Sequence, residues 1–253
     1  AAGSDHVLRD EPMAVHTTFR IGGPADYFVE PADASALAKG IALCREVDVD
    51  YFVTGNGSNL LVRDKGIRGA VIQIYNRMAE ITIEGNTIHT KGGALLSAVA
   101  ARAADKGLTG LEFASGIPGS IGGAVVMNAG AYGGELKQVV TEATVMTKDG
   151  MILHVPAEKM ALGHRISNFM QTGEIILSVK MQLTQGNPDV IKETMNDFNS
   201  RRRDKQPLEY PSAGSTFKRP EGYFAGKLIS DAGLKGFTCG GACVSEKHAG
   251  FVV

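Results

Sequence analysis

Residues 116–134 read Gly-Ile-Pro-Gly-Ser-Ile-Gly-Gly-Ala-Val-Val-Met-Asn-Ala-Gly-Ala-Tyr-Gly-Gly, and seven of these nineteen residues are glycine. The glycines alternate with apolar residues, which is not typical of a flexible linker. Such a segment predicts backbone that passes close to a flat or anionic ligand, where a Cβ would collide. A second glycine loop, Gly55–Asn59, directly follows the apolar run Tyr51-Phe52-Val53. Together the two loops predict an extended ligand with a phosphate part and a planar part, and a dinucleotide fits this description.

The first glycine loop matches neither of the two common nucleotide-binding motifs. A P-loop ends in Gly-Lys-Ser/Thr, and a Rossmann loop opens directly into a helix. Here Leu60-Leu61-Val62 is expected to continue as an extended apolar run. The backbone N–H groups of the loop, with the Ser58 and Asn59 side chains, are still suited to hold a pyrophosphate. A plain hairpin turn is the alternative for this loop.

The composition describes an ordinary globular protein without a charge bias. The chain has 253 residues, 43% hydrophobic residues and a net charge of −1, which favours neither nucleic acid nor membrane binding. No apolar run reaches the roughly 20 residues that span a bilayer, and the first twenty residues do not resemble a signal peptide. Three cysteines do not form a disulfide framework. These features predict a cytoplasmic protein.

The pattern of apolar residues predicts three consecutive units. Residues 1–75 contain a strand–helix–strand pattern, with strands near 27–29, 51–53 and 71–74 and a helix over 35–47. Residues 76–186 contain two hairpins, the second turned at Asp149-Gly150, a helix over 94–106 and a strictly alternating strand over 175–183. Asn187-Pro188-Asp189 predicts a helix start and a domain boundary near residue 186. Residues 187–253 follow, with a helix candidate over 224–231.

Several charged or reactive residues have an ordinary structural explanation when each is considered alone. Arg165 is as easily a partner in a surface salt bridge, and Ser215, which follows a glycine, is as easily a turn residue. The run Arg201–Lys205 is typical of a solvated helix end. Cys239, Cys243 and His248 do not have the ligand number or spacing of structural zinc, so no metal is expected.

Six segments taken in order resemble one enzyme family over the whole chain. They are His16–Gly23, Gly55–Asn59, residues 116–134, Gly163–Phe169, Ala213–Pro220 and Gly240–Ser245. This set is similar to the UDP-N-acetylenolpyruvoylglucosamine reductases (MurB), flavoenzymes of bacterial wall synthesis. The short connection from Phe224 to Gly236 resembles the shorter type of the family, which lacks an extra tyrosine loop.

The resemblance implies an α+β fold: a two-subdomain FAD-binding domain of the PCMH type followed by a C-terminal α/β substrate domain. It implies non-covalent FAD, with NADPH as reductant, and reduction of UDP-N-acetylglucosamine enolpyruvate to UDP-N-acetylmuramate in peptidoglycan precursor synthesis, hence a role in cell wall biogenesis, cell shape and division. The expected partner is a small UDP-sugar, with no nucleic acid or membrane, and the protein is expected to be a monomer in the cytoplasm.

The resemblance also implies roles for individual residues. Arg165 matches the arginine that stabilises negative charge at the substrate carboxylate, and Ser215 matches the serine that donates the proton. His164, Lys205, Lys218 and Arg219 are expected to bind the substrate. The residues expected to bind the cofactor are Gly55, Asn56, Gly57, Ser58, Asn59, Gly119, Ser120, Gly122, Gly123 and Asn128, with the isoalloxazine near Asn128.

Three departures from the family pattern qualify these expectations. His164 stands where tyrosine is common, and Arg219 stands where many members have asparagine. The family's glutamate that works with the arginine is expected in a tail beyond residue 253, so the C-terminal domain is expected to be truncated in this sequence.

Two other functions remain open at this stage. One is a related flavin oxidase or dehydrogenase with a histidine-tethered flavin, against which residues 51–64, which contain no histidine, argue. The other is a nucleotide-binding or regulatory module without turnover.

Overall fold

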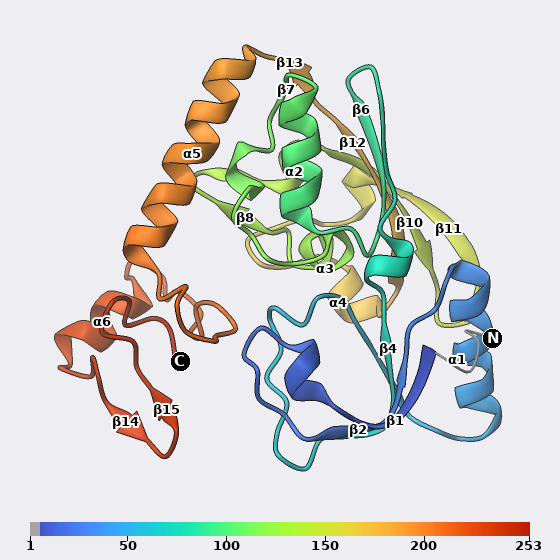
Figure 1. The fold of residues 1–253 in the computed structure, drawn as a ribbon. Helices are drawn as coiled ribbons and strands as arrows, with labels where there is room; N and C mark the ends of the chain where they lie inside the picture. Colours follow the sequence, from blue (N-terminus) through green and yellow to red (C-terminus); the bar gives the residue numbers. More distant parts are fainter. Residues whose placement is uncertain (1–5) are drawn as a thin grey trace.

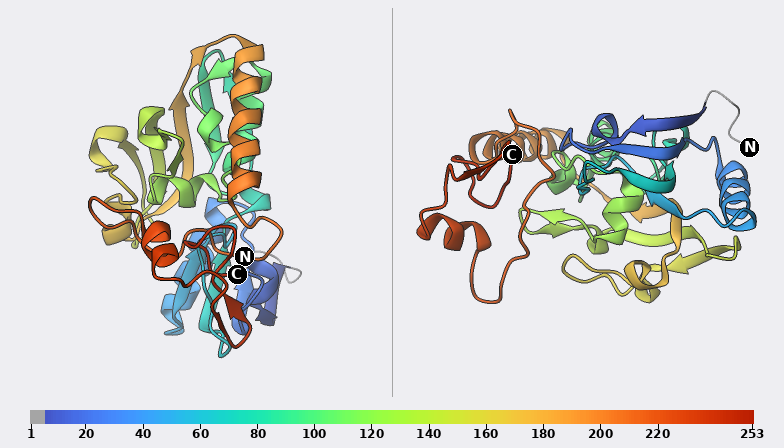
Figure 2. Two further views of the ribbon diagram at one scale, coloured as in Figure 1. Left: turned by 90° about the vertical axis from the view of Figure 1, so that its left-hand side faces the viewer. Right: turned by 90° about the horizontal axis from the view of Figure 1, so that it is seen from below.

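The computed structural model describes residues 6–253. Within them, two β-sheets are followed by a long helix and a C-terminal segment (Figure 1). Figure 2 shows the long helix running beside the second sheet, with the C-terminal segment beyond its end. None of the helices in this described range is long and apolar enough to cross a membrane.

The first sheet has the strand order β1-β2-β4-β3, with β2 and β3 both parallel to β4 and β1 antiparallel to β2 at the edge. Its parts are β1 (Val7–Pro12), β2 (Pro24–Val29), α1 (Ala34–Glu46), β3 (Tyr51–Thr54) and β4 (Ile67–Gln73). Helix α1 begins where Asp33 Oδ1 accepts a hydrogen bond from Ala36 N at 2.8 Å. Its buried residues Leu37 and Ile41 pack between the two sheets, in one cluster with Ile72 and Leu177.

The segment Leu60-Leu61-Val62, expected to continue as an extended apolar run, forms no strand: Val62 is buried, whereas Leu61 is 64% exposed. It belongs to the connection between β3 and β4. Because these two strands are parallel, the glycine loop before it is not a hairpin turn.

The second sheet is antiparallel, with the order β11-β10-β12-β6-β5. Its strands are β5 (Ile81–Glu84), β6 (Thr87–Lys91), β10 (Val140–Met146), β11 (Ile152–Pro156) and β12 (Ile175–Gln182). Central β12 shows the expected alternation, except that Ile176 and Leu177 are both buried. Each packs into a different core cluster, because this end of β12 has apolar clusters on both of its faces.

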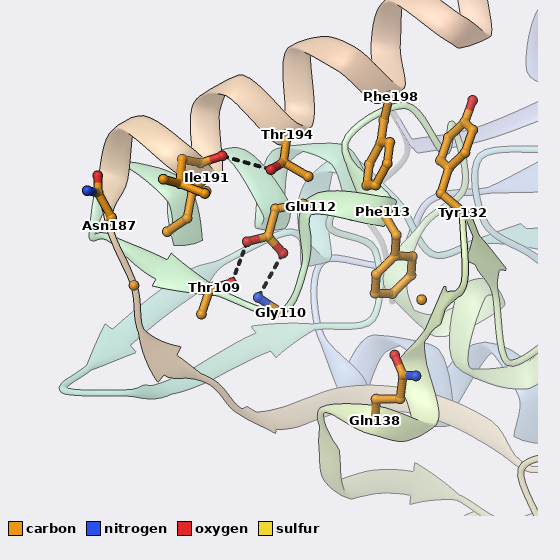
Figure 3. A pocket seen from close by; sticks show the side chains of 13 residues that line it. Thr109, Gly110, Glu112, Phe113, Tyr132, Gln138, Asn187, Ile191, Thr194 and Phe198 are labelled. Carbon is orange, nitrogen blue, oxygen red and sulfur yellow. Dashed lines mark hydrogen bonds between the residues drawn. The ribbon is translucent and has the colours of Figure 1, made fainter.

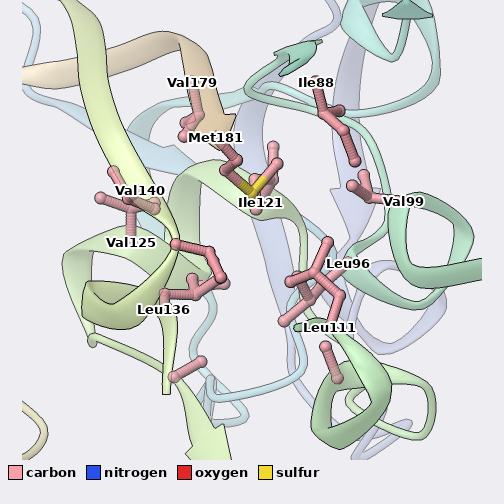
Figure 4. Packing of buried hydrophobic residues seen from close by; sticks show 14 of the residues in the cluster. Ile88, Leu96, Val99, Leu111, Ile121, Val125, Leu136, Val140, Val179 and Met181 are labelled. Carbon is pink, nitrogen blue, oxygen red and sulfur yellow. The ribbon is translucent and has the colours of Figure 1, made fainter. Parts of the chain in front are cut away.

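The largest core lies between the second sheet and the helices α2 (Leu96–Asp105) and α3 (Ile121–Val126) (Figure 4). Leu96, Val99 and Ile121 are fully buried there against Met181 of β12. Burial of each such side chain contributes roughly 1.5–3 kcal/mol relative to exposure. The second glycine segment is therefore anchored by its own apolar residues.

Shorter elements complete the first 186 residues. They are β7 (Leu108–Thr109), β8 (Gly130–Ala131), β9 (Gly134–Glu135), β13 (Thr184–Gln185), α4 (Phe169–Thr172) and the 3-10 turns η2 (Met13–His16), η3 (Asn76–Met78), η4 (Glu112–Ala114), η5 (Leu136–Gln138) and η6 (Ala157–Lys159).

Helix α5 (Pro188–Lys205) begins at the expected position, where Asn187 Oδ1 accepts a hydrogen bond from Asp189 N at 2.9 Å. Helix α6 (Ala225–Asp231) and the strands β14 (Thr238–Cys239) and β15 (Ala242–Cys243) follow. The C-terminal segment contacts the first sheet region through Thr18, whose Oγ1 donates to the Ser212 carbonyl at 2.7 Å.

Candidate functional site

The two glycine loops, which come from different sheets, meet at one place. Asn56 Nδ2 donates a hydrogen bond to the Pro118 carbonyl oxygen at 2.5 Å. A Cβ on Gly55 would collide with Ser120 Oγ, and a Cβ on Gly119 would lie 3.4 Å from Ser58 Oγ. The fold therefore brings together the two segments that the sequence singled out separately.

Gly57 is required by the packing of the first loop against residues 16–18. Its φ is +62°, in the left-handed region, and a Cβ there would collide with the His16 carbonyl oxygen. The Thr18 backbone N–H donates to the Gly57 carbonyl at 3.3 Å, which fixes the loop against the residues before β2.

The crossing presents free hydrogen-bond donors. The backbone N–H groups of Gly55 to Asn59 donate to no other residue within the described range 6–253. The hydroxyl of Ser120, a residue only 3% exposed, also has no hydrogen-bond partner there. Successive free amides with a hydroxyl form an anion-binding concavity.

A cavity of about 430 Å³ opens beside the crossing. Its lining includes β3, Gly55, Ser120 and the two glycines of α3, Gly122 and Gly123. A Cβ on Gly123 would meet only Ser120 Oγ, at 3.6 Å, whereas a Cβ on Gly122 would lie 3.0 Å from the Gly92 carbonyl oxygen. Gly122 is therefore tied to the fold, and Gly123 leaves open space beside the cavity. Free amides, a hydroxyl and a slot left open by glycine fit a pyrophosphate joined to a planar ring.

Asn128 has a different task from the one expected. It is 1% exposed, and its Nδ2 donates to Glu135 Oε2 at 2.8 Å and to the Gly163 carbonyl at 2.9 Å. Its Oδ1 accepts from Lys137 N at 2.9 Å. The structure thus does not support direct cofactor contact by the Asn128 side chain, because protein groups already occupy this buried amide.

Arg165 lies within a narrow turn. Gly163 N donates to the Ile166 carbonyl at 3.0 Å, and between them Arg165 has a φ of +57°. Its exposed guanidinium donates from Nη2 to the Gly130 carbonyl of β8 at 2.8 Å. No carboxylate of residues 6–253 pairs with it, so the alternative of a surface salt bridge is not what the described structure contains. His164, also exposed, is its neighbour in the turn.

Glu135 is a site residue that the sequence reasoning missed. Its Oε1 forms a 2.6 Å ion pair with Lys137 Nζ. The hydrogen bond from Lys137 lowers the pKa of Glu135, and Lys137's charge, the Asn128 amide and nearby His164 lower it further. A sequence signal was present: Glu135 and Gln138 form a capping box around η5.

Ser215 lies in the C-terminal segment against residues 248–251. It forms a β-bridge with Phe251, and Thr216 N donates to the Gly250 carbonyl at 2.9 Å. The position of a Cβ on Gly250 would lie 3.6 Å from Ser215 Oγ and 2.9 Å from the His248 ring. The structure does not join Ser215 to Arg165: no hydrogen bond links the two within the described residues.

Three of the four residues expected to bind substrate belong to α5 and the C-terminal segment. Lys205 ends α5, and Lys218 and Arg219 follow Ser215; all three are exposed. Arg219 places its guanidinium 3.9 Å from the centre of the Phe224 ring and donates from Nε to the Tyr223 carbonyl at 3.2 Å.

Arg202 departs from the expected solvated helix end. Neighbouring Arg201 is exposed and pairs with Asp197 at 2.7 Å, one turn earlier on α5. Arg202 is half-buried, burial lowers its pKa, and its Cδ lies 2.8 Å from the position of a Cβ on Gly116. It forms no ion pair with the acidic residues that the structure describes. A half-buried cation therefore lies beside the second glycine loop without an anionic partner.

A second cavity, of about 540 Å³, lies between α5 and the segments around η4 and β9 (Figure 3). Tyr132 and Phe198 stack at its edge with ring centres 4.5 Å apart. Glu112 faces it, but its carboxylate accepts from Thr109 Oγ1 at 2.5 Å and Gly110 N at 2.8 Å. No residue expected to bind cofactor or substrate lines this cavity. Within residues 6–253 no cluster of three or more His, Cys, Asp or Glu side chains could hold a metal ion.

Comparison with known sequences finds two family matches. Residues 25–156 match the FAD binding domain family, and residues 206–253 match the C-terminal domain of UDP-N-acetylenolpyruvoylglucosamine reductase. The UDP-N-acetylenolpyruvoylglucosamine reductase of Agathobacter rectalis is 57% identical over 259 residues, covering 98% of this chain and 82% of the relative. That of Clostridium perfringens is 52% identical over 249 residues, with the same coverage of both chains.

Solved structures give a concordant result. The crystal structure of UDP-N-acetylenolpyruvylglucosamine reductase (MurB) from Thermus caldophilus superimposes with a TM-score of 0.85 at 34% identity, over 98% of this chain and 86% of that one. Cholesterol oxidase from Brevibacterium sterolicum matches 71% of this chain and 38% of its own with a TM-score of 0.53 at 16% identity, which shows similarity of fold alone.

Proposed function

Because the chain belongs to the UDP-N-acetylenolpyruvoylglucosamine reductase family, we propose that its two glycine loops hold FAD and that Arg165 and Ser215 act on the substrate. The protein is an FAD-dependent oxidoreductase that reduces UDP-N-acetylglucosamine enolpyruvate with NADPH in peptidoglycan precursor synthesis. Bound FAD would supply the hydride chemistry that links NADPH to the enol carbon of the substrate.

The observation that carries the cofactor assignment is the crossing of the two loops. The free amides of Gly55–Asn59 and the Ser120 hydroxyl suit the pyrophosphate. Gly119 faces Ser58 of the first loop, and Gly123 lines the cavity, where it leaves room for a planar ring. Asn128 is proposed to support this site indirectly, as a buried residue whose amide donates hydrogen bonds to Glu135 and to the Gly163 carbonyl.

Arg165 is the proposed charge stabiliser. Hydride arrival at the enol carbon moves negative charge toward the substrate carboxylate. A guanidinium that is already positioned stabilises this charge without reorganisation. The single hydrogen bond to Gly130 and the absence of an acidic partner in the described chain leave the other N–H groups of Arg165 available for a carboxylate.

Ser215 is the proposed proton donor to the carbon next to that carboxylate. Ser215 is exposed, and its backbone is held by the β-bridge to Phe251. A serine is a weak acid, and Lys218 in the same segment is the proposed cation that favours its deprotonated state. We assign Lys205 and Arg219 to the diphosphate region of the substrate and His164 to the vicinity of the flavin.

The three units 1–75, 76–186 and 187–253 are proposed as the two FAD-binding subdomains and the substrate domain. The first sheet ends at Gln73, the second begins at Ile81, and α5 begins at Pro188. We further propose that the protein acts as a cytoplasmic monomer and binds no nucleic acid, since NADPH and a UDP-sugar are cytoplasmic metabolites and the net charge is −1. Gel filtration of the FAD-loaded protein tests the monomer.

Two measurements test the proposed function. Acid precipitation should release yellow flavin into the supernatant, whereas flavin that stays in the pellet would indicate a tethered cofactor and a related oxidase. NADPH oxidation should be fast only when the enolpyruvyl substrate is present. Oxidation at the same rate without that substrate, or none with it, would contradict the assignment and favour a binding module.

A further inference from the structure

Arg165 is not held in place by local sequence alone. Its φ of +57° is unusual for a residue with a side chain. Such a conformation costs of order 1–3 kcal/mol and persists when surrounding contacts determine it. The structure shows which contacts these are.

The buried amide of Asn128 is linked both to the turn that carries Arg165 and to the strand pair that orients its guanidinium. One of its N–H groups binds the Gly163 carbonyl, at the start of the turn that carries Arg165. The other binds Glu135, which is paired in register with Gly130, the residue whose carbonyl accepts the Arg165 guanidinium. The turn and the carbonyl that orients the side chain are thus linked through two hydrogen bonds of one amide.

Glu135 determines which way this amide points. Its Oε2 accepts from Asn128, while its Oε1 pairs with Lys137, whose backbone N–H donates to Asn128 Oδ1. Three hydrogen bonds therefore fix the orientation of the Asn128 amide: to Glu135 Oε2, to the Gly163 carbonyl and from Lys137 N. An amide flipped by 180° would lose all three. The Glu135 side chain, which is 25% exposed, lies at the edge of this network.

We propose that Glu135 is a positioning residue for the reduction: through Asn128 it fixes the Arg165 turn so that the guanidinium meets the substrate carboxylate. This inference rests on the proposed role of Arg165. Glu135 itself is not required to contact either substrate or cofactor.

The test measures the two half-reactions separately in FAD-loaded Glu135→Ala, Glu135→Gln and Arg165→Met. Flavin reduction by NADPH should be unchanged in Glu135→Ala, and flavin reoxidation by the enolpyruvyl substrate should be roughly 10–100-fold slower, the size of effect that a misplacement of about 1 Å produces. Glu135→Gln keeps an acceptor for Asn128 and should recover most of the rate. The double variant with Arg165→Met should be no slower than Arg165→Met alone, because the positioned group is gone.

Glu142→Ala is the control for loss of a carboxylate. Glu142 lies on β10, with its side chain 42% exposed and its Oε1 3.3 Å from His154 Nδ1, and both half-reactions should keep the wild-type rates.

The results separate two failures. If Arg165→Met slows both half-reactions equally, the proposed role of Arg165 fails, and the positioning role fails with it. If Arg165→Met is selective but its effect and that of Glu135→Ala add in the double variant, only the positioning role is overturned. Equal slowing of both half-reactions by Glu135→Ala, without recovery in Glu135→Gln, would also overturn it and leave a merely structural glutamate.

Discussion

The side-chain amide of Asn56 lies 2.5 Å from the carbonyl oxygen of Pro118, and this hydrogen bond joins two glycine loops 62 residues apart in sequence. One loop leaves the first sheet after β3, and the other leads into α3 beneath the second sheet. The contact therefore lies between the two sheets, and the surroundings of individual glycines there lead to separate predictions.

Gly123→Val should abolish retention of FAD while the protein still folds. A Cβ at this position meets only Ser120 Oγ, at 3.6 Å, so the protein itself has room for the added Cβ. It would instead occupy the space beside the cavity that the planar ring needs. The flavin content of the purified protein, from the ratio of visible to ultraviolet absorbance, gives the result.

Gly40→Val is the matched control for this substitution. A Cβ on Gly40, in α1, meets nothing within 4 Å, so this variant should purify with normal flavin. A Gly123→Val protein that is fully yellow would show that the cofactor lies elsewhere.

Arg165→Met should leave flavin reduction by NADPH largely intact and slow flavin reoxidation by the enolpyruvyl substrate. We expect a loss of roughly 10²–10³ or more, by analogy with removal of one oxyanion donor. Stopped-flow absorbance of the flavin measures both steps. Normal reoxidation in this variant would mean that another cation serves the substrate carboxylate.

Ser215→Ala should retain hydride transfer but slow proton delivery to the product. The hydrogen on the carbon next to the carboxylate comes from a hydroxyl that exchanges with solvent, so turnover in deuterated water should label that carbon. Product analysis by NMR and steady-state rates test this together. Unchanged turnover would remove the serine from the mechanism and make water the acid.

Local patterns predicted most of the fold. The alternation of β12, the hairpin turned at Asp149-Gly150 and the start of α5 after Asn187 are all confirmed. Edge strand β1 was missed because its residues are mostly exposed and carry no apolar alternation. The two-residue strands β7 and β13 were missed because they pair with each other across about 75 residues of sequence, Thr109 with Thr184 and Leu108 with Gln185.

The candidate site was predicted only in part, because some of its contacts join residues that are distant in sequence. Glycine-rich composition is a local signal, and it found both loops. The tasks of Asn128 and Arg202 depend on contacts with Gly163 and Gly116, 35 and 86 residues away in sequence, which no local pattern reports. The run Arg201–Lys205 is typical of a solvated helix end, and its sequence does not show that Arg202 lies on the face of α5 that packs against Gly116.

Acid should weaken the contribution of Glu135 to stability. The folded protein has a Glu135 pKa below the ordinary value of 4.5, so this contribution is present above that pH and is lost as pH falls through the lowered folded pKa. Glu135→Gln should therefore be less stable than the wild type at neutral pH, and the difference should shrink in acid. Urea unfolding at a series of pH values measures this, with Glu142→Gln as an exposed control. A difference that stays constant down to strong acid would contradict the ion pair with Lys137.

Arg202→Met should weaken binding of FAD and not the folding of the apoprotein. A half-buried guanidinium without an anionic partner in the described chain costs desolvation energy that the folded protein alone does not recover. A bound anionic group beside the second glycine loop would recover it, since a hydrogen bond to a charged group contributes about 1.5–3 kcal/mol. We therefore expect the Kd for FAD, from fluorescence titration of the apoprotein, to rise roughly 10–100-fold. The melting temperature of the apoprotein should stay the same or rise. Arg201→Met, which removes the exposed neighbour paired with Asp197, should change neither quantity. An unchanged Kd for FAD together with a raised KM for the UDP-sugar would assign Arg202 to the substrate diphosphate and would refute its placement at the cofactor.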